Sequence, residues 1–532
     1  MLTRLDDLVR RGDSDRPALT FRDETISYGE LRERVAAAAA GLRRLGIRRG
    51  ERVMVYLEKR VETVVASLAV SAAGAVLVPV NPVAKAPQVA YIAVDCAAVA
   101  LVTTPERYRK MLGELPRATA LTHLVLVGDA CDELAGGWRL TRWAELSTED
   151  SDGSTVDGVI DADVAAIFYT SGSTGGPKGV VLSHRNLLAG AESVASYLGH
   201  TREDVVLSVL PLSFDAGFSQ LTTSLYAGAH LVLVNYLMPR EVVRLCERHR
   251  VTALTCVPPL WIQLVGQPWP AASSRHLRYF ANTGGRMPQT TLARLRAIFP
   301  AAKPFLMYGL TEAFRSTYLD PSEVDSRPDS IGKAIPNAEI LVVRPDGTPC
   351  EPYEHGEIVH RGALVALGYW NDPERTAQRF RPCAPPRSLS ERRQANDRQQ
   401  GEPHPSGNAV WSGDLAYRDE DGFLYFVGRT DDMIKTSGYR VSPTEVEEVA
   451  YATGLVGEAV AFGVPDEQLG QHIVLAVTGP AGDTCDTETL AKALDRDLPK
   501  YMRPKRIVVL PRLPRSGNGK FDRVKLRNVV CL

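Results

Sequence analysis

The chain has 532 residues, of which 62 are lysine or arginine and 63 are aspartate or glutamate, giving a formal net charge of -1 at pH 7. This balance gives no electrostatic reason to expect a nucleic acid or an anionic membrane as partner. The length exceeds one ordinary hydrophobic core, so we expect two to three domains or a large multi-lobed body that can bury a small ligand.

The cysteines and the N-terminus give a first expectation of where the protein works. The cysteines stand singly, without a close pair at metal-ligand or redox spacing, so we expect reduced thiols of a cytoplasmic protein that act as small apolar fillers. Aspartate and arginine recur through the first residues, which lack the apolar core of a secretion signal. We interpret them as mature sequence.

The first predicted helix follows Ile26 and ends near Gly46. Apolar residues recur along it at helical spacing, at positions 31, 35, 39 and 42. The next segment, VMVYL, predicts a strand. Residues 63–80 are uncharged and approach the length of a membrane span, but Gly74 and Pro79 interrupt them. We therefore predict a buried helix up to Ala73, a stop at the glycine and a short core strand, with no membrane span.

Short apolar runs, often β-branched, follow along the chain, and each leads into Gly, Pro, Ser or Asn. They are AAIFYT, VVLSVLPL, HLVLVNY, ALTCVPPL and RYFANTGG. Strands of this kind that alternate with helices are typical of layered α/β architecture with mostly parallel sheets. We expect a large multi-lobed N-terminal α/β domain.

A phosphate-binding loop is predicted directly after AAIFYT, in the sequence YTSGSTGGPKG. Glycines let the backbone approach a polyanion, hydroxyl groups donate hydrogen bonds, and a lysine supplies charge. The loop differs from the common P-loop because Pro177 replaces its second glycine and a glycine follows Lys178. A flexible Ser/Gly linker is the alternative, but linkers rarely follow a buried strand directly. The predicted phosphate contacts are Thr170, Ser171, Gly172, Ser173, Thr174, Gly175 and Lys178.

Composition changes sharply between residues 381 and 408, where proline, arginine, glutamine and serine replace large apolar residues. Such a segment cannot bury a core, and we predict a mobile surface loop. The sequence that follows predicts a hairpin with its turn at 419–422. We place a domain boundary at Asp431, which divides the chain into residues 1–430 and a small α+β domain of residues 431–532.

Four long motifs together resemble the adenylate-forming superfamily, which comprises acyl-CoA synthetases, adenylation domains of non-ribosomal peptide synthetases and firefly luciferase. They are TSGSTGGPKGVVLSH, YGLTEA, the block from Ser412 to Glu447, and PRSGNGKFDR. The resemblance covers nearly the whole chain and is greatest to bacterial stand-alone acyl-CoA ligases. It implies an enzyme that uses ATP to activate a carboxylic acid as an acyl adenylate and then passes the acyl group to a thiol.

The resemblance also implies residues that bind the base of ATP. The ring of Tyr308 would pack on adenine, and Gly309 follows it in the same motif. Gly284 and Gly285 would let the backbone lie beside the base, since they carry no side chain.

Further residues would bind the ribose, the phosphates and Mg²⁺. Thr311 would contact the α-phosphate, and Glu312 would hold the Mg²⁺ that neutralises charge on the transferring group. Asp414 would accept both ribose hydroxyls, with Arg429 supporting ribose and phosphate. The alternative for Glu312 and Asp414 is an ordinary surface carboxylate.

Lys520 matches the catalytic lysine of the family, whose ammonium would lie between the carboxylate and the phosphate during adenylation. In the family the small domain then swings to bring a second face to the active site. Asp431 would be the hinge residue, and Gly438 would line the tunnel through which the thiol enters.

The acid pocket is expected at Phe214, Asp215 and Gly217. Amino-acid-activating members of the family carry an aspartate in this stretch that pairs with the substrate's ammonium, and Asp215 stands in that place. The alternative is that Asp215 caps the following helix. Both interpretations remain open.

The sequence contains no recognisable carrier domain, so we expect the thiol to come from CoA or from a separate carrier protein. A carboxylate–CoA ligase is the leading hypothesis. A stand-alone enzyme that loads an amino acid such as proline onto a carrier protein is the main alternative. A luciferase-like oxygenase and a non-catalytic nucleotide-binding module are the alternatives from other classes.

Overall fold

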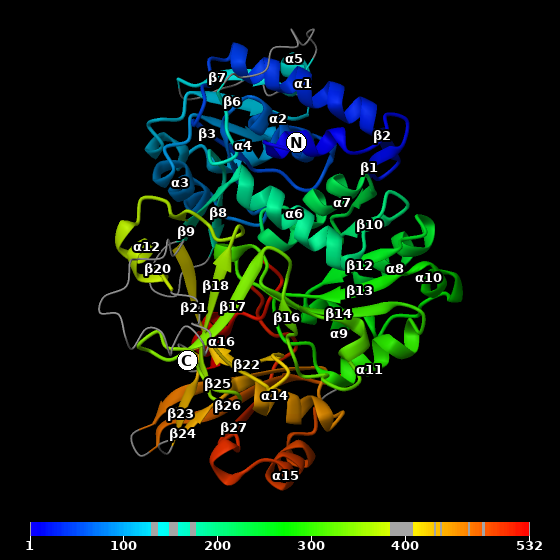
Figure 1. The fold of residues 1–532 in the computed structure, drawn as a ribbon, viewed down its shortest axis with the longest axis vertical. Coiled ribbons are helices and arrows are strands. Elements are labelled where there is room, and N and C mark those ends of the chain that lie inside the picture. The colour runs from blue at the N-terminus through cyan, green and yellow to red at the C-terminus, as the bar shows by residue number, and fades with distance from the viewer. Residues whose placement is uncertain are drawn as a thin grey trace, which may run out of the picture.

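The computed structural model describes residues 2–128, 137–147, 158–170, 177–383, 408–429, 432–436, 439–466, 469–480 and 485–530. Figure 1 shows a large body with a smaller domain, in orange and red, at its lower end. The large body contains layered α/β sheets and the small domain combines a sheet with helices, which confirms the expected fold class.

The first sheet of the large body has eight strands in the order β19-β9-β8-β4-β3-β5-β6-β7. They are β3 (Arg52–Val55), β4 (Val76–Pro79), β5 (Ala100–Thr103), β6 (His123–Leu126), β7 (Arg139–Arg142), β8 (Val164–Thr170), β9 (Lys178–Ser183) and β19 (Gly368–Tyr369). Strands β3 to β8 run parallel, whereas β9 runs antiparallel to β8. The predicted phosphate segment therefore connects the two strands of a hairpin.

The second sheet has nine strands in the order β16-β15-β14-β13-β12-β10-β11-β1-β2. They are β1 (Pro17–Phe21), β2 (Glu24–Ser27), β10 (Val205–Ser208), β11 (His230–Leu233), β12 (Ala253–Cys256), β13 (Tyr279–Asn282), β14 (Lys303–Tyr308), β15 (Thr317–Leu319) and β16 (Lys333–Ala334). The six central strands, from β14 to β1, are parallel. This confirms the expectation of mostly parallel strands for these two sheets.

A third sheet departs from that expectation because it is wholly antiparallel. It contains β17 (Ala338–Val343), β18 (Gly356–Gly362), β20 (Phe380–Pro382), β21 (Asn408–Arg418) and β22 (Leu424–Arg429). Strands β21 and β22 form the predicted hairpin, and the amide of Gly422 donates to the carbonyl of Asp419 across its turn. Residues 384–407 of the predicted surface loop lie outside the described residues.

The first two helices begin and end as the sequence indicates. Helix α1 (Tyr28–Arg44) starts after Ser27, whose side chain accepts from the amide of Glu30 while the Glu30 side chain accepts in return. Helix α2 (Val61–Ala72) is followed by Gly74, at φ 73°, and then by β4. The predicted helix, glycine stop and core strand are confirmed. Within the described ranges, no helix combines the length and the apolar character needed to cross a bilayer.

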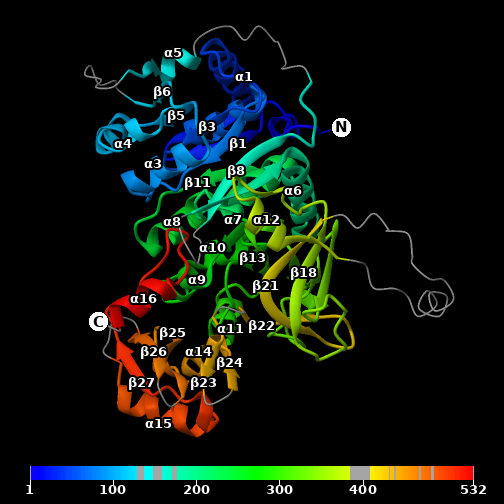
Figure 2. The ribbon, with the colours of Figure 1, turned by 90° about the vertical axis from the view of Figure 1, so that its left-hand side faces the viewer.

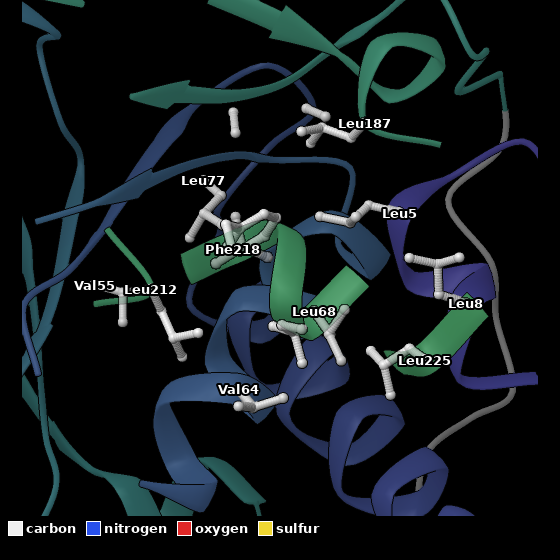
Figure 3. Close-up of a cluster of buried hydrophobic side chains, with 14 of the residues drawn as sticks. Leu5, Leu8, Val55, Val64, Leu68, Leu77, Leu187, Leu212, Phe218 and Leu225 are labelled. Atoms are coloured by element: carbon white, nitrogen blue, oxygen red, sulfur yellow. The ribbon is translucent and has the colours of Figure 1, made fainter. Parts of the chain in front are cut away.

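The helices around the core include α6 (His184–Leu198), α7 (Asp215–Ala227) and the short helix η1 (Leu5–Arg10). Figure 3 shows Phe218 and Leu225 of α7 among Leu5 and Leu8 of η1 and Leu68 of α2. The ring of Phe218 also lies edge-on to that of Phe168 in β8, with centroids 5.2 Å apart. Because α7 is packed between these elements, its first residue, Asp215, has a fixed position in the large body.

The other helices of the large body cover the sheets and connect their strands. They are α3 (Ala86–Asp95), α4 (Pro105–Met111), η2 (Leu115–Arg117), α5 (Trp143–Ser147), α8 (Pro239–Arg248), α9 (Pro258–Leu264), α10 (Ala271–His276), α11 (Gln289–Ile298), η3 (Thr311–Ala313), η4 (Pro321–Glu323) and α12 (Pro373–Arg379). The cysteines that the structure describes are free and buried.

The small domain contains β23 (Ile434–Thr436), β24 (Tyr439–Val441), α14 (Pro443–Ala452), β25 (Glu458–Asp466), β26 (Gly470–Thr478), α15 (Thr487–Asp497), η6 (Lys500–Met502), β27 (Arg506–Val509) and α16 (Arg523–Val530). Its strands form one sheet with its own apolar cores. The predicted boundary residue, Asp431, lies outside the described residues, between the end of β22 and the start of β23.

Several contacts join the small domain to the large body. Ile262 of α9 packs against the core of the small domain. Arg286 of the large body lies 3.7 Å from the carboxylate of Glu448 in α14, and Arg515 of the small domain donates to the carbonyl of Pro259. Figure 2 shows the red chain before α16 reaching up beside the large body. These contacts bring residues near the C-terminus to the parallel sheet.

Candidate functional site

The β8–β9 hairpin presents two of the predicted phosphate-binding residues. Thr170 and Lys178 lie opposite each other in the register of the two strands. The hydroxyl of Thr170 is buried and has no hydrogen-bond partner among the described residues, so it is available to a ligand. Ser171, Gly172, Ser173, Thr174 and Gly175 lie outside the described residues.

Lys178 forms an ion pair with Glu312, the residue that the family resemblance predicts as the ligand of Mg²⁺. Its ammonium lies 2.7 Å from Oε1 of Glu312 and 2.9 Å from the hydroxyl of Tyr369, which itself donates to the same oxygen at 2.7 Å. Burial alone would raise the pKa of Glu312, but the charge and hydrogen bond of Lys178 and the bond from Tyr369 outweigh it and lower the pKa. Glu312 is therefore a charged oxygen ligand inside the protein.

Tyr369 is a member of this site that sequence reasoning missed. It belongs to β19, which pairs with β9 so that Tyr369 lies opposite Val180. Burial and the neighbouring Glu312 carboxylate raise the pKa of its phenol, which stays protonated and can donate. The residue is far from Lys178 and Glu312 in the sequence, and only the pairing of β19 with β9 brings the three together.

Asp414 and Tyr308 form a second polar group at the end of the antiparallel sheet. The hydroxyl of Tyr308 donates to Oδ2 of Asp414 at 2.6 Å. The other carboxylate oxygen has no hydrogen-bond partner among the described residues, and Nε of Arg429 lies 3.5 Å from it. Burial outweighs the attraction of Arg429 and raises the pKa of Asp414. A buried acceptor without a donor fits the hydroxyl groups of a ribose.

Thr311 and Glu312 stand in the short helix η3, directly after β14 and Gly309. A side chain at position 309 would lie 3.0 Å from Cα of Arg315, so glycine allows the chain to turn back closely on itself. The turn ends at Phe314, whose φ of 58° is unusual for a bulky residue. This tight turn directs the side chain of Glu312 toward Lys178. The side chain of Arg315 points elsewhere, toward Asp215.

Lys520 reaches the large body from the small domain. A Cβ atom built on Gly284 would lie 2.6 Å from Cε and 3.3 Å from Nζ of Lys520, and one on Gly285 would lie 3.1 Å from Cγ of Pro258. Part of the lysine side chain keeps contact with solvent, but the surrounding protein desolvates its ammonium and lowers the pKa. The charges of Asp215 and Asp414 act on this ammonium in the opposite direction, so it lies within electrostatic range of a predicted nucleotide residue and a predicted acid residue.

Asp215 does not cap α7, and the capping alternative is wrong. Asp215 is the first residue of the helix, the N-cap position belongs to Phe214, and no side-chain cap bond forms there. The carboxylate of Asp215 instead accepts from Nη1 of Arg315 at 3.1 Å. Arg315 follows the YGLTEA motif by two residues, but its role as the partner of Asp215 could not be read from the sequence.

The other two predicted pocket residues support the start of α7. Phe214 is buried. Any side chain on Gly217 would collide with the carbonyl oxygen of Pro211, so glycine lets the helix pack against the chain that leads into it. Asp431 and Gly438, predicted as hinge and tunnel residues, lie outside the described residues.

The oxygen atoms of the site suit a magnesium–nucleotide complex. Mg²⁺ prefers oxygen ligands and is commonly held by one or two carboxylates together with phosphates. Glu312 supplies a carboxylate, Thr170 a free hydroxyl and Lys178 a cation for phosphate. These residues would hold the ion, which would neutralise phosphate charge.

Replacing Gly284 with alanine tests the contact with Lys520. The new methyl group would displace the lysine ammonium, so we expect the rate of adenylation to fall about ten-fold, as a displacement of about 1 Å can cost more than that. Gly50→Ala is the matched control, because Gly50 has a similar φ of 80° and open space around it. Both variants should lose about 1 kcal/mol of folding stability. Equal rates in the two variants would contradict the prediction.

Two family models match the chain. A model of AMP-binding enzymes matches residues 7–370, and a model of the C-terminal domain of AMP-binding enzymes matches residues 445–520.

Curated relatives include enzymes with different acceptors. The chain is 32% identical to an L-proline–[L-prolyl-carrier protein] ligase of Streptomyces coelicolor, covering 95% of this chain and 92% of the relative. It is 26% identical to a long-chain-fatty-acid–CoA ligase of Bacillus subtilis, covering 96% and 91%. It is 30% identical to the delta-poly-L-ornithine synthetase of Acinetobacter baumannii, covering 96% of this chain. The chain spans 35% of the length of that synthetase and 6% of a linear gramicidin synthase of Brevibacillus parabrevis.

Solved structures of the same fold include complexes with nucleotides. ATP-bound MatB from Rhodopseudomonas palustris has a TM-score of 0.83 and 26% identity, covering 99% of this chain and 98% of that one. The o-succinylbenzoate CoA synthetase of Bacillus subtilis, in complex with its acyl-adenylate intermediate, has a TM-score of 0.80 and 26% identity, covering 99% of each chain. An anthranilate CoA ligase matches the fold with a TM-score of 0.86 at 23% identity, covering 99% and 97%.

Proposed function

Since this chain belongs to the family of AMP-binding enzymes and is an adenylate-forming ligase, we propose that it converts a carboxylic acid, ATP and CoA into an acyl-CoA, AMP and pyrophosphate. The observation that carries the proposal is the position of Lys520, which reaches from the small domain to Gly284, within electrostatic range of Asp414 and Asp215. A cation between the nucleotide residues and the acid residues is what adenylation requires.

In the first step a carboxylate oxygen of the acid attacks the α-phosphorus of ATP. A phosphorus–oxygen bond forms, the bond to pyrophosphate breaks, and negative charge develops on the phosphate oxygens. Lys520 would stabilise that charge from the acid side, while Lys178 and the hydroxyl of Thr170 bind phosphate oxygens. Asp414 would hold the ribose through its free oxygen, and Glu312 would hold Mg²⁺.

In the second step the sulfur of CoA attacks the carbonyl carbon of the acyl adenylate. A carbon–sulfur bond forms, the carbon–oxygen bond to AMP breaks, and the thiol proton is released to solvent. The substrate carbonyl is already activated by its bond to phosphate, so no further nucleophile is needed from the protein. We propose that the small domain, hinged at Asp431, rotates between the steps and presents Gly438 to the thiol.

A carrier-protein thiol is the second candidate acceptor. The similarity of this chain, over 95% of its own length, to a prolyl-carrier protein ligase favours this acceptor. The same chemistry serves both acceptors, because the pantetheine thiol that attacks is common to CoA and to carrier proteins that bear a phosphopantetheine group but no acyl group yet.

The test is pyrophosphate release in the presence of ATP and Mg²⁺ across fatty, aromatic, dicarboxylic and amino acids, with and without CoA, and with product masses recorded. An acid that releases pyrophosphate and yields a CoA adduct supports the proposal. Pyrophosphate release without a CoA adduct, and acyl transfer only to a carrier protein, would favour the second candidate. No release with any acid would refute an adenylating enzyme.

The lowered pKa of Lys520 predicts an early loss of adenylation at alkaline pH. The charged ammonium is the active form, so the rate falls as pH rises through its pKa, which lies below the ordinary lysine value because of desolvation. Arginine stays charged throughout this range. We therefore expect Lys520→Arg to be slower but to lose this alkaline decline, measured as pyrophosphate release against pH. The same decline in both proteins would assign it to another group.

A further inference from the structure

Resting on the proposed function, we propose that Arg315 determines substrate specificity: it occupies Asp215 in an ion pair and thereby makes the site select carboxylic acids without an ammonium group next to the carboxylate. An aspartate at this point of the pocket would by itself attract an amino acid. Here its charge already has a partner.

The ion pair is buried and its geometry is fixed. The Arg315 side chain is 2% exposed and that of Asp215 is 17% exposed, with 3.1 Å between Nη1 and Oδ2. The same Nη1 donates to the carbonyl of Phe314 at 2.8 Å. A buried charge that loses its partner is costly, so neither side chain can leave the other for a weakly bound ligand.

The backbone on either side also holds Arg315 in place. Phe314 has a positive φ, and its ring packs so closely on α6 that a Cβ atom at Gly190 would lie 2.7 Å from it. Farther along α7, a cavity of about 10 Å³ lined by Arg315, Ala216, Ser219 and Thr223 has room for at most one water molecule. On this side of the ion pair the guanidinium therefore lacks the space to swing away from Asp215.

The charges of the pocket oppose an additional cation. Arg315 and Lys520 are positive and Asp215 is negative, and all three interact electrostatically. The net positive charge of these three residues attracts the carboxylate of a substrate. An ammonium on the substrate carbon next to that carboxylate would meet two cations and a carboxylate that is already paired. A hydrogen, hydroxyl or methylene group at that carbon carries no such cost.

Matched acids test this specificity directly. We would compare cyclopentanecarboxylate with proline, 3-methylbutanoate with valine, and 3-phenylpropanoate with phenylalanine in pyrophosphate release. For the wild-type enzyme we expect at least a ten-fold higher kcat/KM for the amine-free member of any pair that is turned over. A preference for the amino acid would overturn the inference but leave the adenylating function intact, whereas no turnover of any acid would refute the function itself.

Variants of the ion pair separate electrostatic selection from pocket shape. Arg315→Met frees Asp215 and should shift the ratio of kcat/KM toward the amino acid by at least ten-fold, while Arg315→Lys should keep the wild-type preference. The double variant Asp215→Asn with Arg315→Met lacks both charges and should lose the shift. Arg344→Met removes an arginine paired with Glu354 in the loop between β17 and β18 and should leave the ratio unchanged. An unchanged ratio in Arg315→Met would overturn the inference, and the wild-type comparison remains decisive if that variant does not fold.

Discussion

Replacing Lys520 with alanine should lower the rate of acyl-adenylate formation about 100- to 1,000-fold, the usual loss when one preorganised charge is removed from a developing anion. The ammonium lies against Gly284 and faces Asp215 and Asp414, so no other described lysine of the small domain has the same position. Transfer to CoA from a supplied acyl adenylate should continue at a similar rate. Single-turnover assays of the two half-reactions measure these effects separately.

Lys525→Ala provides the control, because Lys525 is an exposed lysine only five residues further along the chain. It should affect neither half-reaction. An equal loss of both half-reactions in Lys520→Ala would contradict the assignment of the lysine to one step, and it would also contradict the proposed rotation of the small domain.

Replacing Glu312 with glutamine should have the second large effect, a loss of about 100-fold or more in adenylation together with a higher requirement for Mg²⁺. The amide keeps the size of the side chain but removes the charge that binds Lys178 and would bind the metal ion. Among the described residues, Lys178 then has no anionic partner until phosphate arrives. Titration of activity with Mg²⁺ at fixed ATP measures the change.

The loss of adenylation activity must be distinguished from the loss of folding stability that follows when any buried carboxylate is removed. Asp204→Asn serves as the control, because Asp204 is also a buried carboxylate paired with a cation, Arg278. That variant should lower thermal stability without changing the dependence on Mg²⁺. If Glu312→Gln has a normal Mg²⁺ dependence, the ion is held by other groups.

Local sequence signals predicted the elements that present the site. The helix after Ile26, the stop at Gly74 and the turn at 419–422 each depend on neighbouring residues, and the structure contains all three. The alternation of short apolar runs with helices likewise predicted the parallel sheets. The third sheet was not anticipated, because the antiparallel pairing of β18 with β21 joins segments that are separated by residues 363–407.

The partners inside the site could not be predicted in the same way. Arg315 meets Asp215 across 100 positions of sequence, and Tyr369 meets Lys178 across 191. Periodicity and caps report on neighbours within a few residues, so they carry no information about such pairs. For the same reason the interpretation of Asp215 as a helix cap was reasonable from its position and wrong in the structure.

Individual contacts between the small domain and the large body are weak, and this affects how often the two domains adopt another relative orientation. A half-buried side chain such as Ile262 contributes about 1 kcal/mol through burial, and a partly exposed ion pair such as Arg286–Glu448 contributes between about 0 and 1 kcal/mol. If two arrangements of the domains differed by about 2 kcal/mol in free energy, a few molecules in a hundred would occupy the less stable one at any moment. Binding of pyrophosphate, AMP or thiol then needs only a small preference for one arrangement to change which one dominates.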